Sequence, residues 1–161
     1  MRLGKSATDS RRGDGSSLRG RRGLLRRHLP PVPARVLDVG GGPGAYARWL
    51  ADLGYDVYLV DPVPLHVEQA TAAASARSQP FTVAQGDARA LAEEARSFDA
   101  VLLLGPLYHL IHSEERLAAL AEARRVLVDR GVMVAAAISR FASTVDGLAR
   151  PSPSPGVRID R

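Results

Sequence analysis

Short apolar runs alternate along this chain with longer segments in which apolar residues recur every three to four positions. The runs at residues 36–39 and 98–104 show no alternation of apolar and polar side chains, which is typical of strands covered on both faces of a parallel sheet. Three further apolar runs are bounded by turn residues. The pattern therefore predicts five strands, at residues 36–39, 57–61, 81–84, 98–104 and 132–138.

Helical spacing between these runs predicts helices that connect the strands. Tyr46, Trp49 and Leu50 fall on one helical face, and Gly54 is of a residue type that commonly ends a helix. Ser113 is a favourable N-cap residue and is followed by two acidic residues. We expect helices at residues 45–53, 64–77 and 113–127, and a short helix at 24–29 that ends before two prolines. Alternating strands and helices predict an α/β fold.

Four glycines in five positions follow the first strand, in the segment Gly40-Gly41-Gly42-Pro43-Gly44. Glycine adopts backbone conformations that are closed to other residues, and it lets a ligand approach the main chain without a Cβ in the way. A nucleotide-like ligand is therefore the expected occupant of this turn.

Two known patterns fit the turn. The spacing Gly40-x-Gly42-x-x-Ala45 resembles the dinucleotide fingerprint, in which a pyrophosphate rests on a helix N-terminus. The spacing Asp38-x-Gly40-x-Gly42-x-Gly44 resembles motif I of the class I S-adenosylmethionine-dependent methyltransferases. We favour the second pattern, because the Asp38 carboxylate would repel a pyrophosphate but suits the cationic amino-acid end of S-adenosylmethionine, directly or through water.

An acidic residue follows each of the next two strands. Asp61 ends the second strand, where an acid accepts hydrogen bonds from the hydroxyls of an adenosine ribose in nucleoside-binding folds. Its alternative role is to cap the next helix. The methyltransferase resemblance implies that Asp87, after the third strand, meets the adenine amino group, and that an adjacent backbone amide meets a ring nitrogen. Without the resemblance, Asp87 is an ordinary turn residue beside Gly86.

The segment Gly105-Pro106-Leu107-Tyr108-His109-Leu110 follows the fourth strand, beside the place where a doubly wound sheet binds its ligand. It resembles a bacterial methyltransferase subgroup that has the same segment. Tyr108 and His109 are therefore the candidates for positioning an acceptor, and a histidine suits removal of a proton near neutral pH. The alternative is a structural histidine. We do not expect a metal site at His109, His112 and Glu115, because these residues straddle a loop and a helix start.

The resemblance covers residues 24–148 and implies an S-adenosylmethionine-binding core of the type 11/12-like methyltransferase domain. It implies a three-layer, Rossmann-like sheet of parallel strands in the order 3-2-1-4-5. The family sheet continues into an antiparallel hairpin that this sequence lacks, so we expect a truncated or frame-interrupted chain whose open edge strand favours self-association. The residues that the resemblance assigns to the cofactor are Asp38, Gly40, Gly42, Gly44, Asp61, Pro62, Asp87, Ala88, Leu104 and Gly105.

Composition bounds this interpretation. A chain of 161 residues, 45% of them hydrophobic, forms one core rather than two. The sequence has no cysteine, which excludes disulfides, thiolate metal sites and thiol catalysis. It contains no apolar run long enough for a membrane span and no secretory h-region, so we expect a cytoplasmic protein without a membrane partner.

The positive charge is concentrated near the N-terminus. The chain has a net charge of +5, but residues 1–30 carry nine Lys or Arg against two Asp, which leaves the remainder at −2. We expect residues 1–23 to form a disordered basic arm and residues 149–161 to form a disordered Pro- and Ser-rich tail. Because no aromatic residue precedes Tyr46, we do not expect the arm to bind nucleic acid.

The expected function is S-adenosylmethionine-dependent methyl transfer to a small-molecule acceptor. Two alternatives stay open. One is a remnant that binds S-adenosylmethionine without turnover, which the missing hairpin favours. The other is a nicotinamide-dependent oxidoreductase with an NAD-binding Rossmann unit, which the charge of Asp38 disfavours. The sequence does not identify the acceptor.

Overall fold

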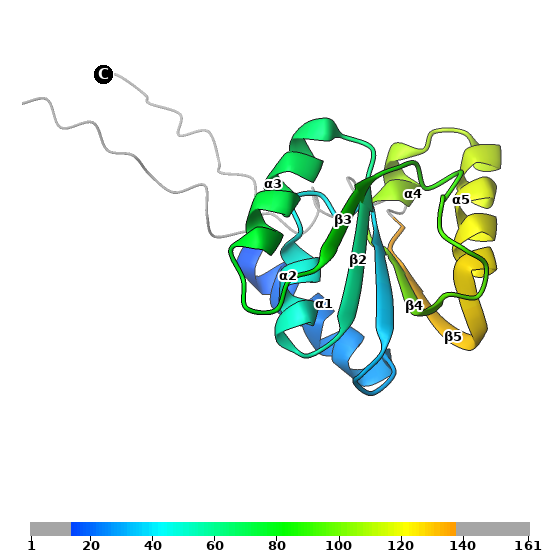
Figure 1. The fold of residues 1–161 in the computed structure, drawn as a ribbon. Helices are drawn as coiled ribbons and strands as arrows, with labels where there is room; N and C mark the ends of the chain where they lie inside the picture. Colours follow the sequence, from blue (N-terminus) through cyan, green and yellow to red (C-terminus); the bar gives the residue numbers. More distant parts are fainter. Residues whose placement is uncertain (1–13, 138–161) are drawn as a thin grey trace, which may run out of the picture.

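The five strands form one parallel sheet in the order β3-β2-β1-β4-β5, which confirms the predicted topology (Figure 1). The computed structural model describes residues 14–137. Its strands are β1 (Arg35–Val39), β2 (Asp56–Asp61), β3 (Thr82–Gln85), β4 (Phe98–Leu103) and β5 (Leu127–Ala135).

Strand β1 lies at the centre of the sheet and is buried from Val36 to Val39. Val36 pairs with Val57 of β2 on one side and with Ala100 of β4 on the other. The chain order therefore reverses between β1 and β4, which is the point where open parallel sheets bind their ligands at the carboxyl ends of the strands.

Helices cover both faces of the sheet (Figure 1). On one face, Leu25, Leu50 and Ala70 of the first three helices share a buried cluster with alternate strand residues. On the other face, Leu107 and Val126 of the last two helices belong to a second cluster. The helices are α1 (Asp14–His28), α2 (Ala45–Asp52), α3 (Pro64–Ser75), α4 (Pro106–His109) and α5 (Ser113–Val126).

The predicted disordered arm at residues 1–23 is wrong for residues 14–23, which belong to α1. The short helix expected at residues 24–29 is the last part of this longer helix. Two contacts of Arg22 support the extension: its guanidinium lies 5.3 Å from the centre of the Trp49 ring, and its Nη2 donates to the carbonyl of Ala45 at 3.5 Å. Arginine is also a good helix former. Residues 1–13 lie outside the described residues.

Strand β5 begins at Leu127, five residues before the predicted start. The Asp129-Arg130-Gly131 segment lies within the strand, where the pairing with β4 shifts register and Arg130 has a φ of +65°. Strand β5 ends at Ala135, three residues before the predicted end, and the boundaries of the other strands and of α2, α3 and α5 agree within two residues. Ile138, the tail at residues 149–161 and the predicted absence of a hairpin concern residues outside the described range.

Helix α4 was expected only as an irregular loop. Pro106 stands in its first turn, where the missing N–H costs nothing, and Leu107 anchors the turn in the second core cluster. Among residues 14–137, no helix combines the length and the apolar character needed to cross a membrane.

Candidate functional site

A cavity of about 450 Å³ opens at the carboxyl ends of the strands, above the point where the strand order reverses. Nine of the twelve predicted site residues line it: Gly40, Gly42, Asp61, Pro62, Asp87, Ala88, Gly105, Tyr108 and His109. Asp38, Gly44 and Leu104 are not among the lining residues. Five lining residues were not predicted: Val63, His66, Arg89, Pro106 and Leu110.

The glycine turn forms one wall of this cavity, and its glycines serve different purposes. Gly40, Gly42 and Gly44 all have positive φ, at +66°, +57° and +82°. A Cβ on Gly40 would lie 2.7 Å from the Cγ of Pro106, so Gly40 allows the loop after β4 to approach β1 closely. A Cβ on Gly42 would meet no atom within 4 Å. Gly42 therefore leaves open space on the cavity side.

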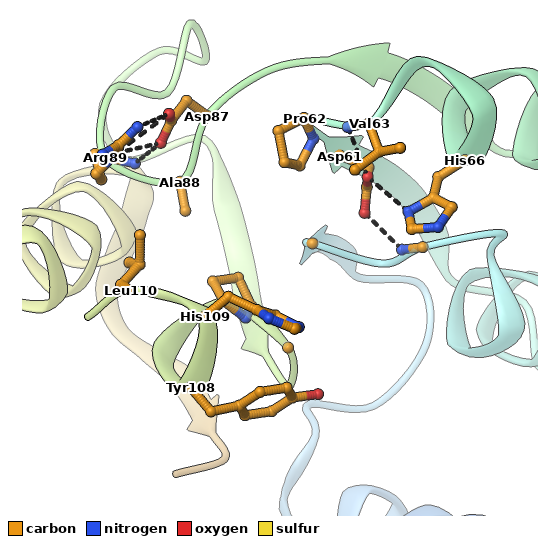
Figure 2. A pocket seen from close by; sticks show the side chains of 14 residues that line it. Asp61, Pro62, Val63, His66, Asp87, Ala88, Arg89, Tyr108, His109 and Leu110 are labelled. Atoms are coloured by element: carbon orange, nitrogen blue, oxygen red, sulfur yellow. Dashed lines mark hydrogen bonds and ion pairs between the residues drawn. The ribbon is translucent and has the colours of Figure 1, made fainter. Parts of the chain in front are cut away.

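The Asp61 carboxylate has three partners within hydrogen-bond distance, and the residue is only 3% exposed (Figure 2). Its Oδ2 accepts a hydrogen bond from the N–H of Gly42 at 2.8 Å. Its Oδ1 accepts one from the N–H of Val63, just ahead of α3, at 3.0 Å, and lies 3.0 Å from Nδ1 of His66. The alternative role of Asp61 as the N-cap of α3 is wrong, because Val63 is the N-cap; Asp61 instead bonds the N–H of that residue while its side chain lines the cavity.

His66 is a cavity residue that the sequence analysis did not single out. The His66 side chain is 39% exposed, but it lines the cavity and contacts Asp61. Pro62 and Pro64 restrict the backbone between the two residues, and this turn brings the first turn of α3 over the end of β2. The five-residue spacing from Asp61 to His66 is not a helical contact spacing, so no standard pattern would have found the pair.

Asp87 lies on the other side of the cavity and is paired with Arg89 (Figure 2). The Arg89 guanidinium donates to both carboxylate oxygens of Asp87, and the backbone N–H of Arg89 donates to Oδ1 at 2.8 Å. Nη1 of Arg89 also reaches Oε1 of Glu115 at 2.5 Å. These hydrogen bonds from Arg89 hold the pKa of Asp87 below its usual range. Arg89 therefore ties the β3 end of the cavity to helix α5.

Asp38 lies beneath the glycine turn rather than in the cavity, so the structure does not give it a direct place at the cavity surface. It is 1% exposed, and its Oδ2 has no hydrogen-bond partner among the described residues. Burial, and then the charge of Asp61, raise the pKa of Asp38 to about 7, against a lowering effect from the backbone of Ala47. A Cβ on Gly41 would lie 2.7 Å from this free oxygen, so the glycine turn packs directly on Asp38.

Tyr108 and His109 lie on the short helix α4, across the cavity from Asp61 (Figure 2). Their ring centroids are 4.7 Å apart, and Tyr108 is largely exposed. His112 instead caps the start of α5 in a capping box with Glu115, so the helix begins one residue after His112 and Ser113 is not the N-cap. Over residues 14–137, no three His, Cys, Asp or Glu side chains gather in a way that could hold a metal ion.

Large exposed apolar side chains occur on both segments that border the cavity mouth. Val63 and Leu65 belong to the segment that starts α3, and Tyr108 and Ile111 belong to the segment around α4. Ile111 is 82% exposed. The charged groups within the cavity are largely paired with one another, as Asp61 is with His66 and Asp87 with Arg89. Exposed apolar side chains therefore border the mouth, and the paired charged groups lie within a lining that is otherwise largely apolar.

Comparison with known proteins assigns this arrangement to a family. The model of a family described as "Methyltransferase domain" matches residues 36–131, which include every predicted site residue. This chain belongs to that methyltransferase family. The matched segment runs from β1 into β5 and so contains the glycine turn, both acidic strand ends and α4.

Curated relatives of this methyltransferase domain match about half of the chain. A ubiquinone biosynthesis O-methyltransferase of Methylocella silvestris is 37% identical over 92 residues, which cover 55% of this chain and 36% of that protein. An uncharacterized methyltransferase of Mycobacterium bovis is 38% identical over 72 residues, which cover 45% of this chain and 28% of that protein. The chain thus spans about a third of the length of the curated relatives it matches.

Solved structures share the fold of the domain. The PH0226 protein of Pyrococcus horikoshii has a TM-score of 0.66 and 28% identity, over 74% of this chain and 58% of that one. A structure titled as the [4+2]-cyclase SpnF has a TM-score of 0.64 and 25% identity, over 76% of this chain and 45% of that one. Because one neighbour is named for a cyclisation, the fold alone does not fix the reaction.

Proposed function

We propose that this domain binds S-adenosylmethionine in the cavity and transfers its methyl group to a small-molecule acceptor. The observation that supports this most is the convergence of the glycine turn, Asp61 and Asp87 on one cavity at the point where the strand order reverses. These parts follow the ends of three successive strands, β1, β2 and β3. The family match and the methyltransferase names of the curated relatives agree with the proposal.

The residues fit such a cofactor on two observations. The open space at Gly42 leaves room for a ligand against the backbone, and the free Oδ2 of buried Asp38 lies directly under the same turn. In the proposal, Gly40 and Gly42 provide close backbone approach and Asp61 receives the ribose. The Asp38 carboxylate attracts the cationic amino-acid end electrostatically, across the glycine turn that covers Asp38.

The far end of the cavity receives the adenine in this proposal. Asp87 accepts from the amino group in place of its longest Arg89 contact, Nε to Oδ2 at 3.2 Å, and the backbone of Ala88 meets a ring nitrogen. Pro62, Gly105 and Leu104 complete the surroundings, although Gly44 and Leu104 contribute by packing rather than as lining residues. When bound, S-adenosylmethionine supplies an electrophilic methyl group on a sulfonium.

Tyr108 and His109 act on the acceptor. Methyl transfer is an in-line displacement, so the protein contributes mainly by holding the acceptor close and, for a hydroxyl or amine, by removing a proton. His109 takes that proton and Tyr108 orients the acceptor. The apolar mouth favours an acceptor with an apolar body, and the O-methyltransferase name of the curated relatives favours a hydroxyl group.

Calorimetric titration with S-adenosylmethionine, S-adenosylhomocysteine and NAD tests the cofactor. We expect saturable binding of both adenosyl compounds and none of NAD. Preferential NAD binding, or no binding by a chain with a cooperative melting transition, would contradict the proposal. A methyl-transfer assay with hydroxyaromatic acceptors then separates an enzyme from a binding-only protein, since His109→Ala should reduce turnover while leaving S-adenosylhomocysteine affinity unchanged.

Three further expectations remain proposals. A cytoplasmic location is expected. Residues 1–13 are not expected to bind nucleic acid, and a direct binding assay tests this expectation. Within residues 14–137, β5 is the outermost strand on its side of the sheet, so self-association through this edge is proposed. Light scattering over a tenfold range of protein concentration tests it, and a constant monomer mass would contradict it.

A further inference from the structure

The Asp61 carboxylate has a partner that ribose binding does not require. Nδ1 of His66 lies 3.0 Å from Oδ1 of Asp61, and the same oxygen accepts a hydrogen bond from the N–H of Val63 at 3.0 Å. Because these contacts come from one turn at the start of α3, they hold Oδ1 from a single rigid direction. The N–H of His66 in turn donates to the carbonyl of Val63 at 3.0 Å, which closes that turn.

The hydrogen-bonding capacity of the carboxylate limits what a ligand can do there. Each carboxylate oxygen has two lone-pair positions and donates nothing, so Nδ1 of His66 must carry the proton. Val63 and His66 together fill Oδ1. Gly42 fills one position of Oδ2 at 2.8 Å, so one acceptor position, on Oδ2, stays open. Since Asp61 lines the cavity, that position is available to a ligand.

We propose that His66 is a positioning residue for the cofactor: it locks the Asp61 carboxylate so that Oδ2 offers a single acceptor position to one ribose hydroxyl. This inference rests on the proposed function of the cavity. Without His66, Oδ1 keeps only the hydrogen bond from Val63, so the carboxylate is held by two partners instead of three.

Three variants isolate this role. His66→Ala removes the hydrogen bond, whereas His66→Asn keeps a short side chain with an N–H donor. Gln69→Ala is a matched control, because Gln69 is an exposed residue of the same helix. Calorimetry should show S-adenosylhomocysteine binding about tenfold weaker in His66→Ala, the change expected from one lost hydrogen bond to a charged group. Binding should stay within about threefold of wild type in His66→Asn and be unchanged in Gln69→Ala.

Ligands that lack one hydroxyl provide a readout that a general structural defect would not reproduce. The 2′-deoxy and 3′-deoxy analogues of S-adenosylhomocysteine are titrated into wild type and His66→Ala. For the analogue that lacks the hydroxyl bound by Oδ2, the tenfold difference between the two proteins should disappear. For the other analogue it should persist. Nitrogen NMR of the free wild-type protein should show the Nδ1-protonated form of the His66 ring.

The outcomes separate this inference from the proposed function. Wild type that binds S-adenosylhomocysteine while His66→Ala binds equally well or more tightly would overturn the inference alone. An equal loss for both deoxy analogues, or a ring protonated only at Nε2, would also overturn it. Wild type that binds no adenosyl ligand would overturn the proposed function and this inference together.

Discussion

The acidic residues at the two ends of the cavity differ in burial and in the groups that hold their carboxylates. At the β2 end, Asp61 is 3% exposed and is held by the backbone N–H groups of Gly42 and Val63, with His66 as a third partner. At the β3 end, the Asp87 side chain is 43% exposed, and its carboxylate is held by the guanidinium and the backbone N–H of Arg89. A buried polar group that loses a partner is costly, whereas water replaces a lost partner at an exposed one. The β2 end should therefore dominate both stability and binding.

The largest expected effect comes from Asp61→Ala, which removes the carboxylate that joins the glycine turn to α3. We expect S-adenosylhomocysteine affinity to fall by at least about a hundredfold, since a ligand contact and the geometry of the turn are lost together. The free energy of unfolding should also fall, by roughly 2–4 kcal/mol. Calorimetry and urea denaturation measure the two quantities.

The control is Asp56→Ala, at the opposite end of the same strand. Asp56 is exposed and pairs only at the surface with Arg35 at 3.1 Å, so its loss should change neither quantity by much. Equal effects of the two substitutions would contradict the difference between the two ends of the cavity.

The second prediction concerns pH and Asp38. The pKa of this carboxyl is raised from its ordinary value of 3.8 to about 7 in the folded protein. Between those values the folded state holds a proton that the unfolded state has released, so the free energy of unfolding should fall as pH rises through this window. The slope is about 1 kcal/mol per pH unit.

Asp38→Asn should remove most of this slope, because the substituted side chain does not titrate. Urea denaturation at pH 5, 6, 7 and 8 measures it in both proteins. A wild-type stability that stays level over this range, or a slope that Asp38→Asn leaves intact, would argue against a buried acid with a raised pKa.

Gly42→Ala sharpens the comparison at the backbone. Gly42 has a φ of +57°, so alanine there should cost roughly 1–2 kcal/mol of stability. The added methyl group would meet no protein atom within 4 Å, so the fold should persist while the methyl group occupies cavity space. The loss in binding free energy for S-adenosylhomocysteine should therefore exceed the loss in the free energy of unfolding. Gly20→Ala in α1, where alanine favours the helix, should leave affinity unchanged and raise the melting temperature slightly.

The smallest effect is expected from Arg89→Ala at the exposed β3 end. The pKa of Asp87 should rise toward its usual range when the Arg89 hydrogen bonds are lost. Affinity for S-adenosylhomocysteine should change by only about threefold, and the change should shrink at high salt because the pair is exposed. The S-adenosylhomocysteine affinity of Arg89→Lys should lie between those of wild type and Arg89→Ala. A hundredfold loss in Arg89→Ala would mean that the β3 end matters as much as the β2 end.

The parts of the fold set by apolar runs and glycine turns could be predicted from the sequence. The five strands follow from patterns of burial and turn residues, whereas their order and the nine cavity-lining residues were predicted through the methyltransferase resemblance. The helix at Pro106–His109 and the early start of β5 depend instead on packing of Leu107 and on pairing of Leu127 with Phe98. Such long-range contacts leave no periodic signal.

The same reason explains the partners that the sequence did not reveal. His66 reaches Asp61 only because of the turn through Pro62 and Pro64, and Arg89 reaches Asp87 by a short loop contact at two residues' distance. An Asp-x-Arg segment in a glycine-containing turn is the signal that could have indicated the second pair. For Asp61 and His66, the only sequence signal was weaker: two titratable residues five positions apart, with two prolines between them.

The central claim is that an adenosyl cofactor lies in this cavity, and NMR mapping of S-adenosylhomocysteine binding tests it most directly. We predict that the largest amide shift changes occur at Gly42, Val63 and Ala88, which surround the cavity. Amides at the opposite end of the sheet, such as those of Arg35 and Ser97, should stay unchanged. Saturable shifts confined to that opposite end, or no shifts in a well-dispersed spectrum, would contradict the account.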